Sequence, residues 1–264
     1  MAASLRSGNW GDLLPRLLSA MVMIAVGVFT IGKGGLWFQG LAVVVTGLMF
    51  WELTRMIDPT KELRAVIFGA LAALAQCAAI YGGAGPFLGL FFILAVAAAS
   101  VASRDKWIVA LYGVFVLFAP WGFVYFREEG SVHQLAWVVV VIVVTDILGY
   151  FAGRFLGGPK FWPKVSPKKT WSGTLAGWIG AALVGFGYSV YFDVSPVFIL
   201  FSVLLSFAGQ MGDIAESAIK RRAGIKDSSN IIPGHGGLLD RFDAMIAASS
   251  VLLILLWAQS SFSA

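Results

Sequence analysis

One face of a predicted helix collects four polar side chains within an otherwise apolar part of the chain. They are spaced i, i+3, i+4 and i+7, and they are Asp213, Glu216, Ser217 and Lys220. Ionisable groups at membrane depth are costly and commonly mark a functional site. Snorkelling to the membrane surface is the simpler explanation for Lys220 and Arg221 alone, but the side chain of Asp213 is too short for that and lies two turns further inside.

A second acidic pair, Asp240 and Asp243, lies at the start of the last apolar segment. The pair is spaced i, i+3 at a predicted helix N-terminus, where the helix dipole favours anions, but capping needs only one carboxylate. Together with Asp213 the pair forms an oxygen-rich set typical of Mg²⁺. Zinc is disfavoured because no second histidine or cysteine lies nearby. Asp146, an isolated carboxylate in the sixth apolar segment, is a further candidate ligand.

Glycines and basic residues lie between these acidic groups. The segment Pro233-Gly234-His235-Gly236-Gly237 offers backbone N–H groups that can approach an anion. His235 either donates to a phosphate or has a structural role. The basic residues around the segment are predicted phosphate ligands, and they are Lys220, Arg221, Lys226 and Arg241. Cations that bind phosphates beside carboxylates that hold a metal predict a nucleotide-handling site, in which we count Asp213, Lys226, Asp240 and Asp243 as catalytic.

A second basic stretch, S-P-K-K-T, places two lysines beside two hydroxyl groups. This composition is typical of phosphate binding, and contact with anionic lipid headgroups explains it equally well. Its candidate binding residues are Ser166, Lys168, Lys169 and Thr170. For Glu52, in the second apolar segment, pairing with Arg55 at i+3 is the simplest explanation.

The composition is that of a polytopic membrane protein. Of 264 residues, 59% are hydrophobic and 12% are charged, and the mean hydropathy is +0.85, which a soluble domain of this size does not accommodate. We predict an all-α fold in a single domain over 1–264, with about nine transmembrane helices. The predicted spans are 12–32, 36–57, 64–81, 85–103, 107–126, 132–152, 173–192, 196–217 and 242–258.

The basic residues support this count. If the N-terminus is cytosolic, every Lys and Arg except Lys33 and Arg127 falls on the cytosolic side, as the positive-inside rule requires. The net charge of +5 is therefore explained by membrane sidedness, and no nucleic acid partner is expected. Two long loops on that side, about 153–172 and 218–241, are expected to form the site with the flanking helix ends. Three glycines either mediate a homodimer or pack helices within one chain, and they are Gly177, Gly180 and Gly185.

The segment 217–243, SAIKRRAGIKDSSNIIPGHGGLLDRFD, resembles the signature of the phosphatidate cytidylyltransferase family, also called CDP-diacylglycerol synthases. A dozen matched positions at fixed spacing are far more specific than a lone glycine motif. They are Ser217, Lys220, Arg221, Lys226, Asp227, Pro233, His235, Gly236, Gly237, Asp240, Arg241 and Asp243. The stretch SPKKTWSG resembles a second family block, in which Ser172 stands where relatives often carry an acidic or amide residue.

The resemblance implies that CTP and phosphatidic acid react to give CDP-diacylglycerol and pyrophosphate. It implies a metal-dependent site on the cytosolic face of the bilayer, in a bacterial inner membrane. Asp213 and Asp240 match the positions that bind the metal centre, which is expected to hold Mg²⁺ and to admit a monovalent ion such as K⁺ beside it. The residues agree with this chemistry, since a soluble nucleotide and a lipid phosphate meet only at the membrane surface.

Two other functions remain alternatives. A transporter of an anionic solute would also have many spans and a basic mouth, but it typically has internal repeats and broken helices near the bilayer midplane. A CDP-alcohol phosphotransferase would carry a paired Asp-x-x-Asp-Gly motif, which this sequence lacks.

Overall fold

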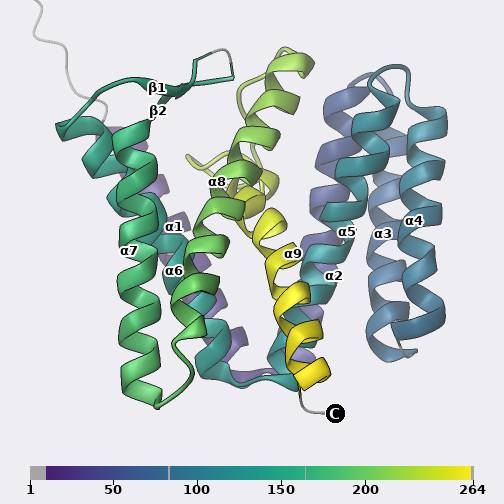
Figure 1. Cartoon of the computed structure of the whole chain (residues 1–264). Coiled ribbons are helices and arrows are strands. Elements are labelled where there is room, and N and C mark those ends of the chain that lie inside the picture. Colours follow the sequence, from purple (N-terminus) through teal and green to yellow (C-terminus); the bar gives the residue numbers. More distant parts are fainter. Residues whose placement is uncertain (1–9, 83, 164, 263–264) are drawn as a thin grey trace, which may run out of the picture.

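The computed structural model describes residues 10–82, 84–163 and 165–262, and within them the chain forms nine helices and one short hairpin (Figure 1). The basic residues Arg6 and Lys164 lie outside the described residues. The elements are α1 (Trp10–Lys33), α2 (Gly35–Ile57), α3 (Glu62–Tyr81), α4 (Ala84–Val101), α5 (Lys106–Glu129), α6 (Val132–Phe155), β1 (Lys160–Trp162), β2 (Ser166–Thr170), α7 (Trp171–Phe192), α8 (Val197–Ala223) and α9 (Leu239–Phe262).

The predicted helical fold is confirmed, and its helices have the character of membrane spans. Seven of the described helices are long and apolar enough to cross a bilayer, namely α1, α2, α3, α5, α6, α7 and α8. Within α4 the apolar part, Phe87–Val101, is shorter. Many large apolar side chains point outward along these helices, as expected where lipid replaces water.

Helix ends meet on two opposite sides of the bundle. On one side, Arg104 in the α4–α5 connection donates to the carbonyl of Ile57 in α2 (3.2 Å) and to that of Arg222 in α8 (3.4 Å). On the other side, Arg127 of α5 donates to the carbonyl of Ile31 in α1 (3.1 Å). The hairpin lies at the top of Figure 1, and the C-terminal end of α9 lies at the bottom. The helices therefore alternate in direction as the charge pattern predicts.

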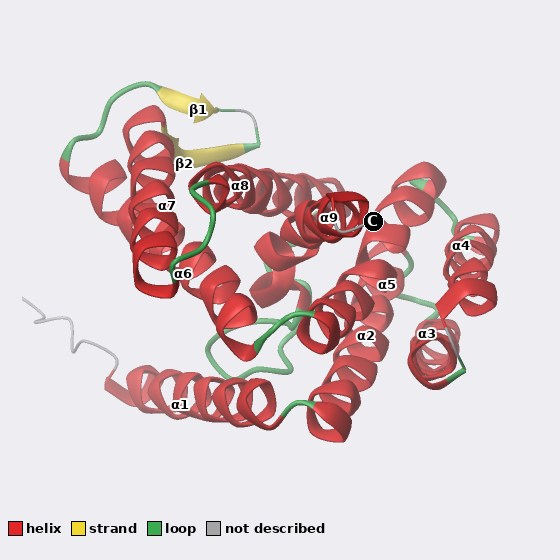
Figure 2. Cartoon of the chain, turned by 60° about the horizontal axis from the view of Figure 1, so that its bottom comes forward, coloured by secondary structure: helices red, strands yellow, loops and turns green. Residues whose placement is uncertain are grey.

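Two buried clusters hold the helices together, and α9 joins them. One cluster centres on α2 to α5 and includes Phe50, Phe91 and Leu117, and the other is built by α5 to α9 around Trp137 and Leu205. α9 contributes to both and packs against α5 and α8 (Figure 2). The N-terminal end of α9 is thereby fixed at the centre of the molecule.

Both long segments, which were predicted to be loops, contain secondary structure. α8 continues to Ala223 and ends at Gly224, whose φ of 74° is the left-handed conformation typical of a helix C-cap. The first six residues of the segment 218–241 are therefore helical. In the segment 153–172, β1 pairs with β2 in antiparallel fashion, Lys160 opposite Thr170 and Trp162 opposite Ser166. The second segment thus forms a hairpin that we did not predict.

The three α7 glycines pack helices within one chain. An added Cβ at Gly177 would lie 2.8 Å from Nε2 of Gln210 in α8, and one at Gly180 would lie 3.0 Å from the side chain of Val144 in α6. At Gly185 the neighbour is the backbone of Ile199, at 2.8 Å. Of the two explanations left open by the sequence, packing within the protomer accounts for these glycines.

Candidate active site

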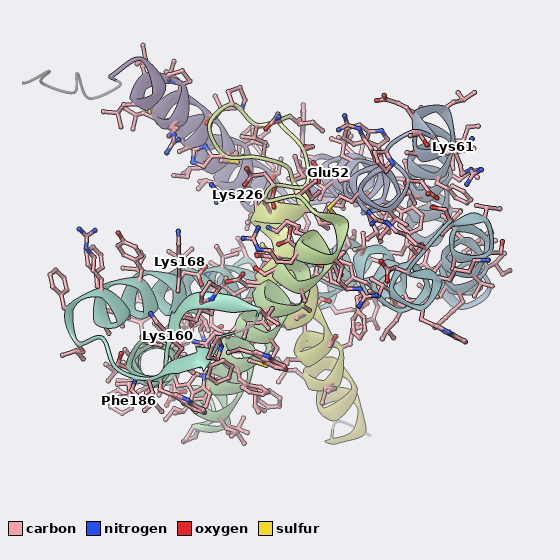
Figure 3. All side chains as sticks on the ribbon, turned by 90° about the horizontal axis from the view of Figure 1, so that it is seen from above. Glu52, Lys61, Lys160, Lys168, Phe186 and Lys226 are labelled. Atoms are coloured by element: carbon pink, nitrogen blue, oxygen red, sulfur yellow. The ribbon has the colours of Figure 1, made fainter. Side chains whose placement is uncertain are left out.

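A pocket of about 480 Å³ opens between α6, the hairpin, the N-terminal end of α7 and the middle part of α8. Its lining combines cations with carboxylates and small residues. The lining residues are Thr145, Asp146, Gly149, Tyr150, Gly153, Arg154, Lys168, Lys169, Thr170, Gly173, Thr174, Gln210 and Asp213. Figure 3, viewed from this end, shows Lys168 on the hairpin side and Lys226 on the loop that leads into α9.

Close packing of α6 against α7 builds one wall of the pocket. An added Cβ at Gly173 would lie 2.5 Å from the carbonyl oxygen of Gly149, so only glycine allows this approach. The hydroxyl of Thr170 accepts from the N–H of Gly173 (3.2 Å) and caps α7 where β2 ends. This junction fixes the direction of Lys169 and Lys168, which immediately precede the cap.

Asp213 forms an ion pair with Lys169 of the hairpin. The ammonium of Lys169 lies 2.6 Å from one carboxylate oxygen of Asp213 and donates to the carbonyl of Gln210 (3.3 Å). The hydroxyl of Ser217 donates to the other oxygen of Asp213 (3.2 Å), which confirms that these two residues share one helix face. Two segments predicted separately, the second basic stretch and the α8 face, therefore meet at one carboxylate.

Three candidate metal ligands lie near one another. Asp243 is within electrostatic range of Asp213 and Asp146, from three different helices. α8 and α9 cross closely here, since an added Cβ at Gly212 would overlap the backbone oxygen of Asp243. Within the described residues no three acidic, histidine or cysteine side chains form a ready-made metal cluster. The arrangement suits a hard cation that takes one or two carboxylates and fills its remaining positions with water or phosphate oxygens.

Beneath this group lies a buried ion-pair network. Lys220 is ion-paired with Glu216, one turn earlier on α8, and with Asp240 of α9 (2.5 Å). The side chains of Lys220, Glu216 and Asp240 are 12%, 0% and 3% exposed. A charge buried to this extent needs its partners, and removing one of them is strongly destabilising. The ammonium of Lys220 is thus held by protein carboxylates.

Asp240 also fixes the loop that precedes its helix. One of its oxygens accepts from the N–H (2.8 Å) and the hydroxyl (2.9 Å) of Ser228, and from the N–H of Gly237 (2.8 Å). An added Cβ at Gly236 would lie 2.7 Å from the same oxygen, and this residue has a φ of 83°. The glycines therefore wrap the backbone around a carboxylate of the protein itself.

Gly237→Ala is expected to lower turnover at least about tenfold, because its added methyl group has no space. It would overlap the hydroxyl of Ser228 and the carboxylate of Glu52, both of which are bonded in the loop. Steady-state kinetics of the purified variant give the measurement. Gly187→Ala on α7 is the control, since nothing lies within 4 Å of the added atom. Equal turnover in both variants would contradict the expectation.

Other predicted residues lie outside the pocket lining. His235 shares a hydrogen bond with the hydroxyl of Ser19 in α1 (2.8 Å), which favours the structural alternative for this histidine. Arg221 is exposed and donates to the carbonyl of Ile225 (3.3 Å), and Lys226 is exposed on the loop. Ser166 opens β2, while Arg241 is exposed in the first turn of α9, within electrostatic range of Asp146.

The predicted pairing of Glu52 with Arg55 is wrong. Arg55 contacts Glu62 of α3 (3.7 Å), whereas the carboxylate of Glu52 is completely buried and accepts three hydrogen bonds from the start of α9 and the loop before it. The sequence analysis did not predict Tyr150 and Arg154, which also line the pocket. The guanidinium of Arg154 donates a hydrogen bond to the hydroxyl of Tyr150 (2.8 Å). Their spacing from Asp146, i+4 and i+8, is the signal that would have identified them.

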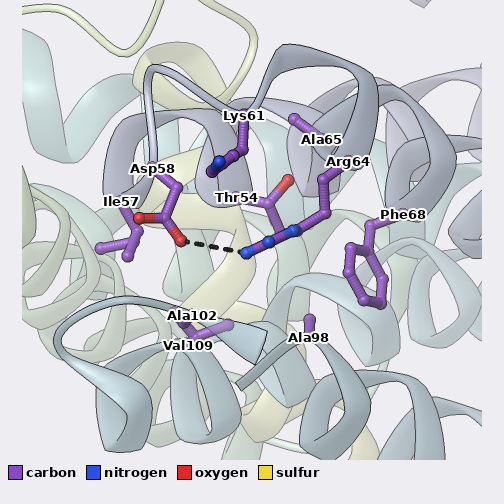
Figure 4. Close-up of a pocket in the computed structure, with 10 residues that line it drawn as sticks. All are labelled: Thr54, Ile57, Asp58, Lys61, Arg64, Ala65, Phe68, Ala98, Ala102 and Val109. Carbon is purple, nitrogen blue, oxygen red and sulfur yellow. Dashed lines mark ion pairs between the residues drawn. The ribbon is translucent and has the colours of Figure 1, made fainter. Parts of the chain in front are cut away.

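A second, much smaller pocket lies away from this chemistry. It has a volume of about 10 Å³ and surrounds the ion pair between Asp58 and Arg64 (3.7 Å; Figure 4). Ser103 donates its backbone N–H to the same carboxylate (3.0 Å). A space of this size holds about one water molecule, so this site joins the α2–α3 and α4–α5 connections and has no room for a substrate.

Comparison with known proteins gives consistent matches over nearly the whole chain. Residues 14–259 match the model of the cytidylyltransferase family. The chain is 33% identical over 257 residues to the phosphatidate cytidylyltransferase of Brucella abortus biovar 1 (strain 9-941), covering 92% of this chain and 93% of the relative. It is 31% identical over 257 residues to the phosphatidate cytidylyltransferase of Staphylococcus epidermidis (strain ATCC 12228 / FDA PCI 1200), covering 91% and 98%.

Proposed function

We propose, from the premise that the chain belongs to the cytidylyltransferase family, that it transfers a cytidylyl group from CTP to phosphatidic acid. The products are CDP-diacylglycerol and pyrophosphate. The relatives named above are phosphatidate cytidylyltransferases, and the match to this chain covers almost their full length. The observation that carries the proposal is the pocket in which Lys168, Lys169 and Arg154 face Asp146 and Asp213 at one end of an apolar bundle.

This pocket has the chemistry that both substrates require. A triphosphate needs cations and N–H donors, which Lys168, Lys169 and Arg154 supply in the pocket lining. The lipid substrate needs a site at the end of membrane-spanning helices, where its phosphate reaches water while its acyl chains stay in the bilayer. The pocket volume of about 480 Å³ is within the range of small-molecule sites.

The reaction itself needs no nucleophile from the protein. A phosphate monoester has a second pKa of roughly 6 and is largely dianionic at neutral pH. One of its oxygens attacks the α-phosphorus of CTP, and the bond from that phosphorus to the bridging oxygen of the β-phosphate breaks as pyrophosphate leaves. The chain then contributes by positioning two anions together and by neutralising their charge.

The residues divide this work between them. Lys168 and Arg154 are exposed at the pocket rim and are the first cations to meet phosphates. Lys169 is placed to exchange its contact with Asp213 for a phosphate oxygen, which would free that carboxylate. Lys220 acts from beneath by holding Asp240, and Arg221, Lys226 and Arg241 extend the cationic surface outward.

A divalent cation fits the same group of residues. Asp213 and Asp243 would hold it, with Asp146 as a further oxygen donor and Asp240 as a support whose oxygens are already bonded to the chain. When bound, Mg²⁺ supplies charge neutralisation to the triphosphate and to the leaving pyrophosphate. A monovalent ion such as K⁺ beside it is part of the proposal.

The proposal includes the arrangement of the helices in the membrane. All nine helices cross the bilayer, the N-terminus is cytosolic and the pocket faces the cytosol, in the inner membrane of a bacterium. The excess of Lys and Arg on the pocket side supports this orientation. The segments 153–172 and 218–241, with the flanking helix ends, then form the catalytic site of a single domain, 1–264.

Removal of divalent cations is expected to abolish pyrophosphate release. The assay uses purified protein in mixed micelles of detergent and phosphatidic acid, with CTP, and compares added Mg²⁺ with EDTA. Release that requires the lipid, the nucleotide and the metal together is the expected result, and diacylglycerol in place of phosphatidic acid is the control. A folded protein that releases no pyrophosphate under any of these conditions would contradict the proposal and favour transport of an anion.

A further inference from the structure

Glu52 is a buried carboxylate that no part of the proposed reaction uses. It lies in the last two turns of α2, far in sequence from the signature segment, and its relative exposure is 0%. The ion pairs found among the described residues do not include it. A buried carboxylate without a cation is costly unless hydrogen bonds replace its water, so its partners should explain its presence.

Those partners come from the loop that leads into α9 and from the first residue of that helix. The hydroxyl of Ser229 donates to one oxygen (2.5 Å), as does the N–H of Leu238 (3.0 Å), and the N–H of Leu239 donates to the other oxygen (2.6 Å). Figure 3 shows Glu52 beside this loop. Every bond therefore joins α2 to residues 229–239, across 177 to 187 positions of sequence.

Glu52 satisfies N–H groups at the start of α9, namely those of Leu238 and of Leu239, the first residue of the helix. The first N–H groups of a helix have no partner within the helix, and a side chain at the N-cap usually accepts from them. The residue in that position here is Leu238, whose carbonyl accepts from Arg241 and Phe242 but whose side chain has no acceptor. The carboxylate of Glu52 fills this role from another helix and places a negative charge at the positive end of the helix dipole.

Glu52 and Asp240 hold the same loop at adjacent positions. Asp240 binds Ser228 and the N–H of Gly237, and Glu52 binds the next serine and the next two N–H groups. Gly237 has no space for a side chain, because an added Cβ would overlap the carboxylate of Glu52 and the hydroxyl of Ser228, which is itself bonded to Asp240. Any shift of the loop away from Glu52 would therefore also move Asp240, and with it the ammonium of Lys220.

We propose that Glu52 is a positioning residue for the proposed cytidylyl transfer, which sets the place of Asp240 and Lys220 by fixing the loop 228–239 to α2. The inference rests on the proposed function for its kinetic consequence. Its structural part, a loop held from α2, is independent of which reaction the pocket carries out.

Glu52→Gln tests the proposal because glutamine keeps the size of the side chain and removes one acceptor. We expect kcat for pyrophosphate release to fall about 10- to 100-fold, while the KM for CTP changes less than about threefold, since the pocket cations are untouched. Amide hydrogen exchange should become faster in peptides that cover 228–240 and stay unchanged in α5 and α6. Glu52→Leu, which keeps no acceptor, should be slower than Glu52→Gln, so that glutamine gives a partial rescue.

The control is Glu62→Gln, a glutamate of α3 whose side chain is 64% exposed. Two results would overturn the proposal: turnover of Glu52→Gln within about twofold of the wild type, or faster exchange throughout the bundle with a general loss of melting temperature. A wild-type protein that releases no pyrophosphate would contradict the proposed function alone. The exchange arm would still decide whether Glu52 fixes the loop.

Discussion

Replacing Asp240 with asparagine is expected to slow pyrophosphate release by a factor on the order of 10²–10³, because no orientation of an amide satisfies the groups around it. One oxygen of Asp240 accepts from Lys220, and the other accepts from Ser228 and Gly237. If the amide oxygen faces the loop, the NH₂ group points at the ammonium of Lys220. If the amide is turned over, the NH₂ group faces two backbone N–H donors.

The measurement is kcat and KM for CTP of purified Asp240→Asn in phosphatidic acid micelles. Asp193→Asn is the matched control, since Asp193 is exposed at the C-terminus of α7 and has a φ of 52°, which asparagine adopts readily. A loss of kcat with a preserved fold is the expected outcome. Undiminished turnover in Asp240→Asn would remove Asp240 from the catalytic set.

The helices could be predicted well because their signal is local. An apolar run of about 20 residues has to be helical in a bilayer, where each backbone group needs a partner within its own segment. The alternation of basic residues predicts that successive helices run in opposite directions, and Arg104 and Arg127 link helix ends on two opposite sides of the bundle. Helix ends were less predictable, since α8 continues to Ala223 through charged residues that a hydropathy argument treats as loop.

The hairpin and the role of Glu52 depend on contacts that local spacing does not reveal. Within and beside β1 and β2, prolines at 163 and 167 and glycines at 157 and 158 are typical of a loop, although Lys160–Trp162 and Ser166–Thr170 pair as strands. For Glu52 the local candidate was Arg55, one turn away, but its actual partners are Ser229, Leu238 and Leu239. Burial decides the outcome, because a carboxylate inside the bundle needs donors that reach it there, and Ser229, Leu238 and Leu239 do so while Arg55 contacts Glu62.

The candidate site was predictable in its residue types and less so in their roles. The spacing of Asp213, Ser217 and Lys220 gave one helix face, and the structure confirms it. Spacing alone did not show that Lys220 is enclosed by Glu216 and Asp240, because that depends on the crossing of α8 and α9. A lysine in a signature motif thus serves the site by ordering its carboxylates.

Lys220→Met is expected to cause the largest loss of stability among these substitutions, about 3–5 kcal/mol of the free energy of unfolding. The side chain of Glu216 is 0% exposed, and its ion pair is with Lys220. Methionine fills the space of the lysine stem but leaves Glu216 and Asp240 as neighbouring buried carboxylates. Denaturant and thermal unfolding in detergent give the measurement, with Lys33→Met, exposed on the opposite side of the bundle, as control.

A double variant separates the structural from the catalytic share of Lys220. Glu216→Gln removes the charge that Lys220→Met leaves unpaired, so the two changes together should restore much of the lost stability. Turnover should stay low, because Asp240 still lacks the cation that orients it beside the loop. If stability and turnover recovered together, Lys220 would matter only for folding. If Lys220→Met alone kept the stability of the wild type, the buried ion pairs of Lys220 would not contribute to the free energy of unfolding.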